Sequence, residues 1–270
     1  MTSEWSTARA VEVNGVRLGY RDSGDPAGPP VVLLHGSGSN ARTWDRFAAH
    51  LTAAGHRAIA VDLRGHATSA RTADYPLTGI RDDVLGLLDT LDLRDVVLVG
   101  HSVGGYAALA AALHSPELIS RLVLEDLAAP PRRAERWSGT GPMQLLAAAA
   151  TVAISRRDYA LRAMRSIFRQ LARPDPGWWA RLGEVRQPTL ILSGGPSSLI
   201  PPHRLADVAA AIPDARFTTI PVGHRVHSLA PDRFTTEVVA FLGKEIRSSS
   251  PSASPDVNVA PIASRLPASG

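Results

Sequence analysis

Ser102 lies in a setting that could make its hydroxyl a nucleophile. It is the central residue of Gly100-His-Ser-Val-Gly104, which follows the apolar run Val96–Val99 and precedes an alanine-rich segment at 106–113. A strand, a sharp Gly-x-Ser-x-Gly turn and a helix make up the nucleophile-elbow layout, in which the turn lifts the serine out at the end of a sheet. The two glycines suit this turn because a side chain at either position would crowd it. The motif alone occurs by chance, but in this setting it predicts a nucleophilic serine.

His224 is the histidine best placed to activate Ser102. A serine hydroxyl is a poor nucleophile near neutral pH and needs a base within hydrogen-bond distance. His224 ends Pro221-Val-Gly-His224, directly after the last predicted strand, so its loop should lie at the same edge of the sheet as the turn at Ser102. His227 is the rival imidazole, and we expect it to support the loop or to line the pocket.

A second loop could stabilise negative charge. Attack on a carbonyl creates an oxyanion, and each backbone N–H aimed at it contributes about 3–4 kcal/mol. The segment His35-Gly-Ser-Gly-Ser-Asn40 follows an apolar run and has few side chains that would block close approach. A tight strand-to-helix connection has the same composition, but beside the turn at Ser102 it favours an oxyanion hole. The expected donors are the N–H groups of Ser37 and Val103.

Alternating strands and helices must position these loops. Asn14-Gly15 is typical of a hairpin that joins the first two strands. The apolar runs that follow predict strands covered on both faces, and amphipathic stripes between them predict helices. The predicted strands are Ala8–Val13, Val16–Arg21, Val31–Leu34, Ala58–Val61, Val96–Val99, Leu122–Leu124, Leu190–Leu192 and Phe217–Ile220; the helical stripes are Ile80–Leu91 with Thr78 as N-cap, Leu205–Ile212 and Phe234–Leu242. This order predicts an α/β fold with a mainly parallel eight-stranded sheet flanked by helices.

The segment 131–187 interrupts the alternation. It contains no strand pattern, and Pro142–Ile154 and Tyr159–Leu171 favour helices. We therefore expect residues 1–130 and 188–247 to form the core and residues 131–187 to form a small helical lid inserted after the sixth strand. Residues 248–270 are rich in Ser, Pro and Ala, which is typical of a disordered tail.

Composition narrows the functional classes. The chain has 270 residues, of which 44% are hydrophobic, enough for one large domain. It has no cysteine, no apolar run of the roughly 20 residues that span a bilayer, and no signal-like N-terminus, so we expect a cytoplasmic protein without a metal or organic cofactor. The net charge is only +4, with no lysine-rich run, which argues against nucleic-acid or membrane partners. Residues 131–187 hold 11 arginines against four acids, either as a solvated helical face or as an attraction for an anionic acyl donor.

Several motifs together resemble the α/β-hydrolase fold superfamily over about residues 10 to 245. They are His35-Gly-Ser-Gly38, Asp62-Leu-Arg-Gly-His66, Gly100-His-Ser-Val-Gly104, Arg121-Leu-Val-Leu-Glu-Asp126, Pro188-Thr-Leu-Ile-Leu192 and Gly223-His224. The combination is specific for the fold and much less so for the reaction, because one fold hosts many reactions. The resemblance implies a catalytic triad in which Ser102 and His224 act with an acid.

The position of that acid departs from the family pattern. Relatives usually carry it in Gly-x-x-Asp-x-x-x-Pro after the penultimate strand, where this chain has Gly194-Gly-Pro-Ser197. A serine cannot supply the negative charge that stabilises an imidazolium. Some relatives, including certain haloalkane dehalogenases, place the acid at the end of the sixth strand, where this chain has Glu125 and Asp126. Adjacent strand residues point to opposite faces, so only one should reach His224. We favour Asp126, with Glu125 as the alternative; Asp126 could also simply cap the following turn.

The sequence thus predicts a serine hydrolase that cleaves an ester or thioester of a small molecule through an acyl-enzyme. A coenzyme A or carrier-protein thioester would suit the arginine-rich segment. Cofactor-free perhydrolases and carbon–carbon bond hydrolases resemble the same pattern and remain alternatives, as does a non-enzymatic small-molecule binding protein on this fold. The serine at the elbow argues against a haloalkane dehalogenase or epoxide hydrolase, which use an aspartate there.

Overall fold

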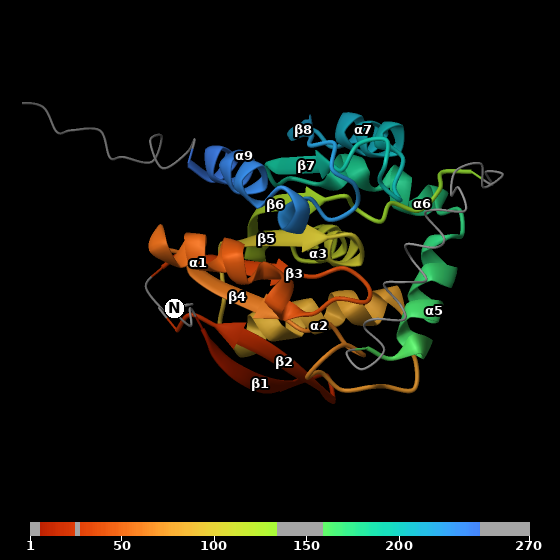
Figure 1. Cartoon of the computed structure of the whole chain (residues 1–270). Coiled ribbons are helices and arrows are strands. Elements are labelled where there is room, and N and C mark those ends of the chain that lie inside the picture. The colour runs from red at the N-terminus through yellow and green to blue at the C-terminus, as the bar shows by residue number, and fades with distance from the viewer. Residues whose placement is uncertain (1–5, 25–27, 134–158, 244–270) are drawn as a thin grey trace, which may run out of the picture.

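An eight-stranded sheet forms the centre of the computed structural model, which describes residues 6–24, 28–133 and 159–243 (Figure 1). In spatial order the strands are β1 (Thr7–Val13), β2 (Val16–Asp22), β4 (Arg57–Val61), β3 (Pro30–Leu34), β5 (Val96–His101), β6 (Ile119–Glu125), β7 (Thr189–Ser193) and β8 (Ala215–Thr219). The β1–β2 and β2–β4 pairs are antiparallel, and all other neighbours are parallel. This confirms the predicted α/β fold and its mainly parallel sheet.

Helices cover both faces of the sheet. The longer ones are α1 (Asp45–Ala53), α2 (Leu77–Thr90), α3 (Val103–His114), α5 (Leu161–Leu171), α7 (Pro202–Ala211) and α9 (Pro231–Gly243); the shorter ones are η1 (Ala41–Trp44), η2 (Pro116–Leu118), α6 (Pro176–Ala180), η3 (Leu182–Glu184) and α8 (Val226–Leu229). Helices α2, α3 and α7 contribute to one core cluster, and α1 and α9 to the other.

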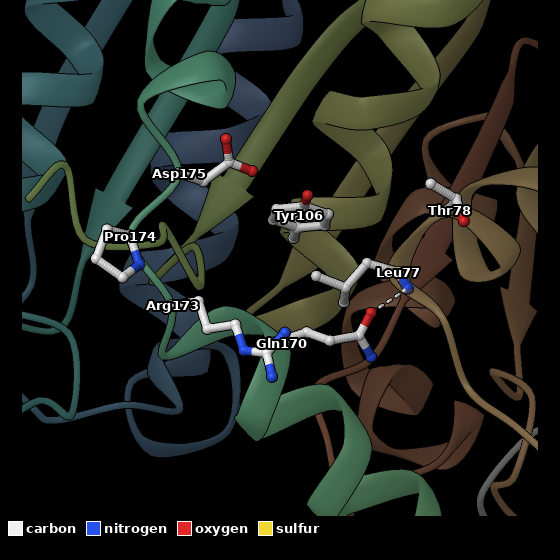
Figure 2. A pocket seen from close by; sticks show the side chains of 7 residues that line it. All are labelled: Leu77, Thr78, Tyr106, Gln170, Arg173, Pro174 and Asp175. Atoms are coloured by element: carbon white, nitrogen blue, oxygen red, sulfur yellow. Dashed lines mark hydrogen bonds between the residues drawn. The ribbon is translucent and has the colours of Figure 1, made fainter.

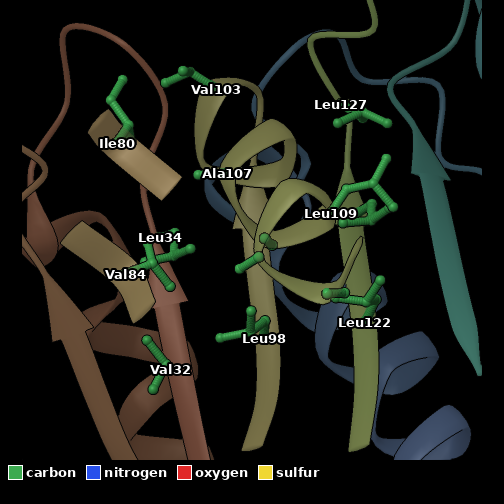
Figure 3. Close-up of a cluster of buried hydrophobic side chains, with 14 of the residues drawn as sticks. Val32, Leu34, Ile80, Val84, Leu98, Val103, Ala107, Leu109, Leu122 and Leu127 are labelled. Atoms are coloured by element: carbon green, nitrogen blue, oxygen red, sulfur yellow. The ribbon is translucent and has the colours of Figure 1, made fainter. Parts of the chain in front are cut away.

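Each buried strand feeds both clusters because its side chains alternate between the two faces. In β3, Val32 and Leu34 belong to the cluster under α3, whereas Val31 and Leu33 face α1 and α9. Figure 3 shows part of the first cluster, where side chains of β3, β5 and β6 lie against α3. Burial on both faces explains why these strands read as continuous apolar runs.

Small residues bring the start of α3 close to β5 and β3. A Cβ added at Gly100 would lie 2.4 Å from the carbonyl oxygen of Gly104, and one at Gly104 would lie 2.3 Å from that of Leu34. No real side chain tolerates such contacts, so glycine is required at both positions. This close approach fixes the turn that carries Ser102.

Two details differ from the sequence expectations. The sequence predicts that Phe217–Ile220 is a strand covered on both faces, yet β8 is an edge strand of the sheet and Phe217 is 40% exposed. Thr78 is not the N-cap of α2: the helix begins at Leu77 and its cap position is Pro76, which makes no side-chain hydrogen bond. The nearby Leu77 N–H instead donates to Gln170 Oε1 (3.2 Å).

Helices α5 and α6 lie between β6 and β7 in the chain and beyond the ends toward which the parallel strands point (Figure 1). The N–H of Ala160, just before α5, donates to the Gly65 carbonyl (2.7 Å), and Trp179 Nε1 of α6 donates to the Pro130 carbonyl (3.0 Å). The predicted helix at Pro142–Ile154 and the predicted tail at 248–270 lie outside the described residues. The proposed lid boundaries therefore stay a prediction. Of the helices in the described ranges, none is long and apolar enough to cross a membrane.

Candidate active site

Ser102 joins β5 to α3 in a strained backbone conformation. Its φ of 53° and ψ of −115° are values that a residue with a side chain rarely adopts. The Ser102 N–H donates to the Glu125 carbonyl (2.9 Å), and the Ser102 carbonyl accepts from the N–H groups of Tyr106 (3.1 Å) and Ala128 (3.2 Å). Strain of this kind persists where the surrounding structure enforces it, and it concentrates at functional sites. The sharp turn at the end of β5 matches the expected nucleophile elbow.

The glycine-rich loop after β3 lies directly against this turn. A Cβ added at Gly36 would lie 2.6 Å from Nδ1 of the buried His101 ring and 3.2 Å from the Ser102 Cβ, so glycine is what permits this close approach. Val103 is the first residue of α3, and its N–H has no partner within the helix. The Ser37 N–H donates no hydrogen bond to another residue of the described ranges. Both expected oxyanion donors therefore lie on segments that meet at Ser102.

Two buried histidines hold the glycine-rich loop from behind. His35 Nδ1 donates to the Gly36 carbonyl (2.8 Å) while its Nε2 accepts from the Leu63 N–H (3.0 Å). His66 Nε2 accepts from the Gly38 N–H (3.1 Å). Burial, together with the charge that a protonated His66 would carry, lowers the pKa of His35 to about 3; burial also lowers the pKa of His66. Both rings are therefore neutral and act as fixed donors and acceptors.

Asp126 is the acid that the structure places against His224. The His224 Nδ1 donates to Asp126 Oδ2 at 2.6 Å. The Gly194 N–H donates to Asp126 Oδ1 (2.9 Å), and the Ser198 hydroxyl donates to Oδ2. Asp126 is fully buried, whereas the His224 side chain is 22% exposed. These donors stabilise a buried carboxylate whose imidazole partner remains open on its other side.

Glu125 pairs with the other histidine of the same loop. Its carboxylate accepts from His227 Nδ1 (2.7 and 2.9 Å) and from the His227 backbone N–H (3.0 Å). The His227 Nε2 is hydrogen-bonded to Thr43 Oγ1 (2.7 Å). Of the two acids that the sequence left open, Asp126 therefore contacts the proposed base, and Glu125 contacts its neighbour.

His101 connects the elbow to the histidine loop. It directly precedes Ser102, and its Nε2 donates to the His224 backbone carbonyl (2.6 Å). The ring centroids of His101 and His224 are 4.7 Å apart. Within the described residues no hydrogen bond joins Ser102 Oγ to His224, and such bonds are often long in enzymes without a ligand. The structure thus brings the two residues to one sheet edge, where His101, the chain neighbour of Ser102, contacts His224.

Ser198 is the contact that sequence reasoning missed. The family position of the acid is held by Ser197, which is exposed, while the buried neighbour Ser198 reaches Asp126. The feature of the sequence that could have indicated this contact is the pair Ser197-Ser198, which stands where a relative would carry a carboxylate. A hydroxyl there cannot replace the acid, but it can donate to an acid that comes from another strand.

A cavity of about 340 Å³ lies one helical turn from the elbow, between α2, α3 and the segment after α5 (Figure 2). It is lined by Leu77, Thr78, Tyr106, Gln170, Arg173, Pro174 and Asp175. The Tyr106 ring stacks on Trp178 of α6, with an angle of 11° between the rings. Neither Ser102 nor His224 lines this cavity. In the described part of the chain, no cluster of three or more His, Asp or Glu side chains is arranged to hold a metal ion.

Comparison with known proteins agrees with this geometry. Residues 31–237 match the model of the alpha/beta hydrolase family, and the chain belongs to that family and is a hydrolase. It is 29% identical over 257 residues to the sn-1-specific diacylglycerol lipase ABHD11 of Mus musculus, covering 81% of this chain and 82% of that protein.

Two further relatives extend the comparison. The crystal structure of a hydrolase from Pseudomonas aeruginosa PA01 superimposes with a TM-score of 0.74 at 28% identity, covering 88% of this chain and 98% of that one. A shorter match, 39% identical over 120 residues, joins 43% of this chain to 42% of the 2-hydroxymuconate semialdehyde hydrolase of Pseudomonas sp. (strain CF600). The names of these relatives cover more than one hydrolytic reaction.

Proposed function

We propose that this protein is a serine hydrolase that cleaves a carboxylic ester or thioester of a small molecule through an acyl-enzyme. The observation that carries the proposal is the His224–Asp126 hydrogen bond (2.6 Å), formed at the sheet edge where Ser102 occupies its strained turn. Because Nδ1 donates to Asp126, the His224 Nε2 carries a lone pair and can act as a base. A nucleophile, a base and an acid that orients the base are the parts that acyl transfer needs.

In the first half of the reaction, His224 Nε2 takes the proton of the Ser102 hydroxyl as the serine oxygen attacks the carbonyl carbon. The carbonyl oxygen becomes an oxyanion, which the N–H groups of Ser37 and Val103 stabilise. The imidazolium then gives its proton to the departing alcohol or thiol, and the acyl group stays on Ser102. The buried Asp126 carboxylate stabilises the imidazolium.

In the second half, His224 activates a water molecule that attacks the acyl-enzyme. The second oxyanion collapses, the proton returns from His224 to the Ser102 oxygen, and the acid is released. The ester assignment is supported by the mouse relative, which is by name a lipase. The alternative leaving group is a thiol of coenzyme A or of a carrier protein. Support for it comes from the exposed side of α5, where Arg162, Arg165 and Arg169 could attract an anionic donor.

A carbon–carbon bond hydrolase is the second candidate, supported by the match to 2-hydroxymuconate semialdehyde hydrolase. A perhydrolase would use the same residues with hydrogen peroxide in place of water. Both keep Ser102 and His224 in the site and differ in the substrate.

The test is labelling by a fluorophosphonate, followed by a substrate panel. We expect the probe to modify Ser102, as located by peptide mass spectrometry, and the Ser102→Ala variant to remain unlabelled. Aryl esters and acyl thioesters of increasing chain length should be hydrolysed, and a vinylogous diketone should not. Faster turnover of the diketone would select the second candidate. Tight ligand binding without hydrolysis of any substrate would identify a binding protein and overturn the proposal.

A further inference from the structure

Glu125 and His227 form a second buried acid–histidine pair that the proposed reaction does not use. The Glu125 side chain is fully buried and that of His227 is 2% exposed. We propose that this pair is a positioning device for His224, which holds the loop 221–227 so that the His224 ring meets Ser102. The inference rests on the proposed role of His224 as the base.

Hydrogen bonds hold this loop on both sides of His224. Before it, the Gly223 N–H donates to the Gly194 carbonyl (2.9 Å). At His224 itself, the backbone carbonyl accepts from His101 Nε2 (2.6 Å). Three residues later, the N–H of His227 donates to Glu125 (3.0 Å). Glu125 therefore holds the loop on the C-terminal side of His224, through its hydrogen bonds to His227.

The end of β6 is suited to positioning His224 because its two carboxylates bind two imidazoles. Glu125 is the last residue of β6, and Asp126 follows it in a left-handed backbone conformation (φ 44°), and the two carboxylates contact different histidines. Asp126 takes the ring of His224 and Glu125 takes the ring and backbone of His227. One rigid strand end thus sets both the orientation of the base and the path of its loop.

The far side of His227 is also locked. Its Nε2 is bonded to Thr43 Oγ1 (2.7 Å), and its ring lies 4.3 Å from the Trp44 ring, measured between centroids. Both ring nitrogens are therefore hydrogen-bonded to protein, and the side chain is buried. A buried histidine with both nitrogens bonded cannot exchange protons with a substrate. It can, however, fix the loop relative to β6 and η1, because it is bonded to a residue of each.

Glu125→Gln tests the proposal with little change in shape. The glutamine amide presents a donor where His227 Nδ1–H also donates, so at least one hydrogen bond to His227 is lost. Because misplacement of a reacting group by about 1 Å can cost about 100-fold in rate, we expect the rate of fluorophosphonate labelling at Ser102 to fall about 10- to 100-fold. The KM for a short aryl ester should change less than about twofold, since the substrate contacts remain.

Asp22→Asn is the matched control. Asp22 is also a buried carboxylate, paired with Arg57 (2.8 Å), but it lies where β2 meets the start of β4, at the opposite edge of the parallel sheet. Its loss should lower the Tm as Glu125→Gln does, yet leave the labelling rate unchanged below the Tm. Hydrogen exchange of the amides of residues 221–227 should accelerate in Glu125→Gln and stay unchanged in Asp22→Asn.

Thr43→Val keeps the proposal falsifiable if Glu125→Gln does not fold. It removes only the hydroxyl at the far side of His227, and we expect a two- to fivefold slower labelling. Wild-type labelling rates and wild-type exchange in the folded variants would overturn the positioning role. If the wild-type protein is not labelled at Ser102, the proposed function fails instead, and the exchange measurement still decides whether Glu125 holds the loop.

Discussion

The two acid–histidine pairs at the end of β6 have the same chemistry and opposite surroundings. The His224–Asp126 and His227–Glu125 hydrogen bonds are 2.6 and 2.7 Å long, and both carboxylates are fully buried. The imidazoles differ: His224 is 22% exposed and His227 only 2%. An acid–histidine pair therefore does not by itself define a catalytic base. The difference lies in the second ring nitrogen: in His227 this atom, Nε2, is hydrogen-bonded to Thr43 Oγ1.

The carboxylates differ as well. Asp126 accepts from Gly194 and Ser198 in addition to His224, so donors outside the imidazole stabilise its charge. Glu125 accepts from two groups of the same residue, His227. The first arrangement joins a buried carboxylate to three different residues, one of which carries the more exposed ring. The second binds a single residue in place.

The strongest test of this contrast removes the more exposed imidazole, that of His224. His224→Ala should lower kcat by about 10⁴-fold or more, because the general base is lost. Its Tm should stay close to that of the wild type, since the side chain is partly exposed. Ester hydrolysis and thermal unfolding are the measurements, with Ser102→Ala as reference. A double variant no slower than either single one would show that the two residues act as a unit; additive losses would contradict a shared step.

Exchanging each carboxylate for its amide sharpens the comparison. Asp126→Asn should lower kcat by about 10³- to 10⁴-fold, because an amide cannot stabilise the imidazolium and favours the wrong tautomer. Glu125→Gln should cost about 10- to 100-fold, through position alone. The ratio of kcat between the two variants, measured at one pH, checks the assignment. The reverse order would make Glu125 the triad acid.

Sequence reasoning reached much of this arrangement but not all of it. Apolar runs located the five central strands, because burial on both faces leaves a plain signature, and the Asn14-Gly15 hairpin located the first two. The same reasoning misjudged β8, since position at the sheet edge depends on strand order, which periodicity does not report. Strand alternation also predicted that one acid alone would reach His224. Ser198 and Thr43 remained hidden, because both lie outside the strands and α-helices, on segments whose paths are set by tertiary contacts.

Ser198 offers a smaller perturbation of the open pair. Ser198→Ala removes one donor to Asp126 but leaves Gly194 and His224 in place. We expect kcat to fall about tenfold, because a hydrogen bond to a charged group contributes about 1.5–3 kcal/mol and the remaining donors offset part of its loss. Ser197→Ala is the matched control, since Ser197 is exposed. Equal rates in both variants would show that the Ser198 contact does not tune the acid.

The smallest expected effect concerns His101. Its ring centroid lies 4.7 Å from that of His224 and 5.1 Å from that of His227. Burial, together with the charges that His224 and His227 would carry, holds the pKa of His101 well below its ordinary value. The ring is therefore neutral when folded, with the proton on Nε2, and its Nδ1 has no partner among the described residues. A neutral ring here spares the imidazolium of His224 a like-charge neighbour.

This lowered pKa makes folding depend on pH with a definite sign. Between pH 7 and 6 the unfolded chain, whose histidine pKa is about 6.5, gains protons at position 101 that the folded protein does not. Protonation then stabilises the unfolded state, and His101 should lower the free energy of unfolding by about 0.7 kcal/mol over that interval. Urea denaturation at both pH values measures the change, and His101→Asn should reduce it by that amount. An unchanged pH sensitivity in the variant would mean that His101 titrates when folded, and that an imidazolium at 224 can form beside a charged neighbour.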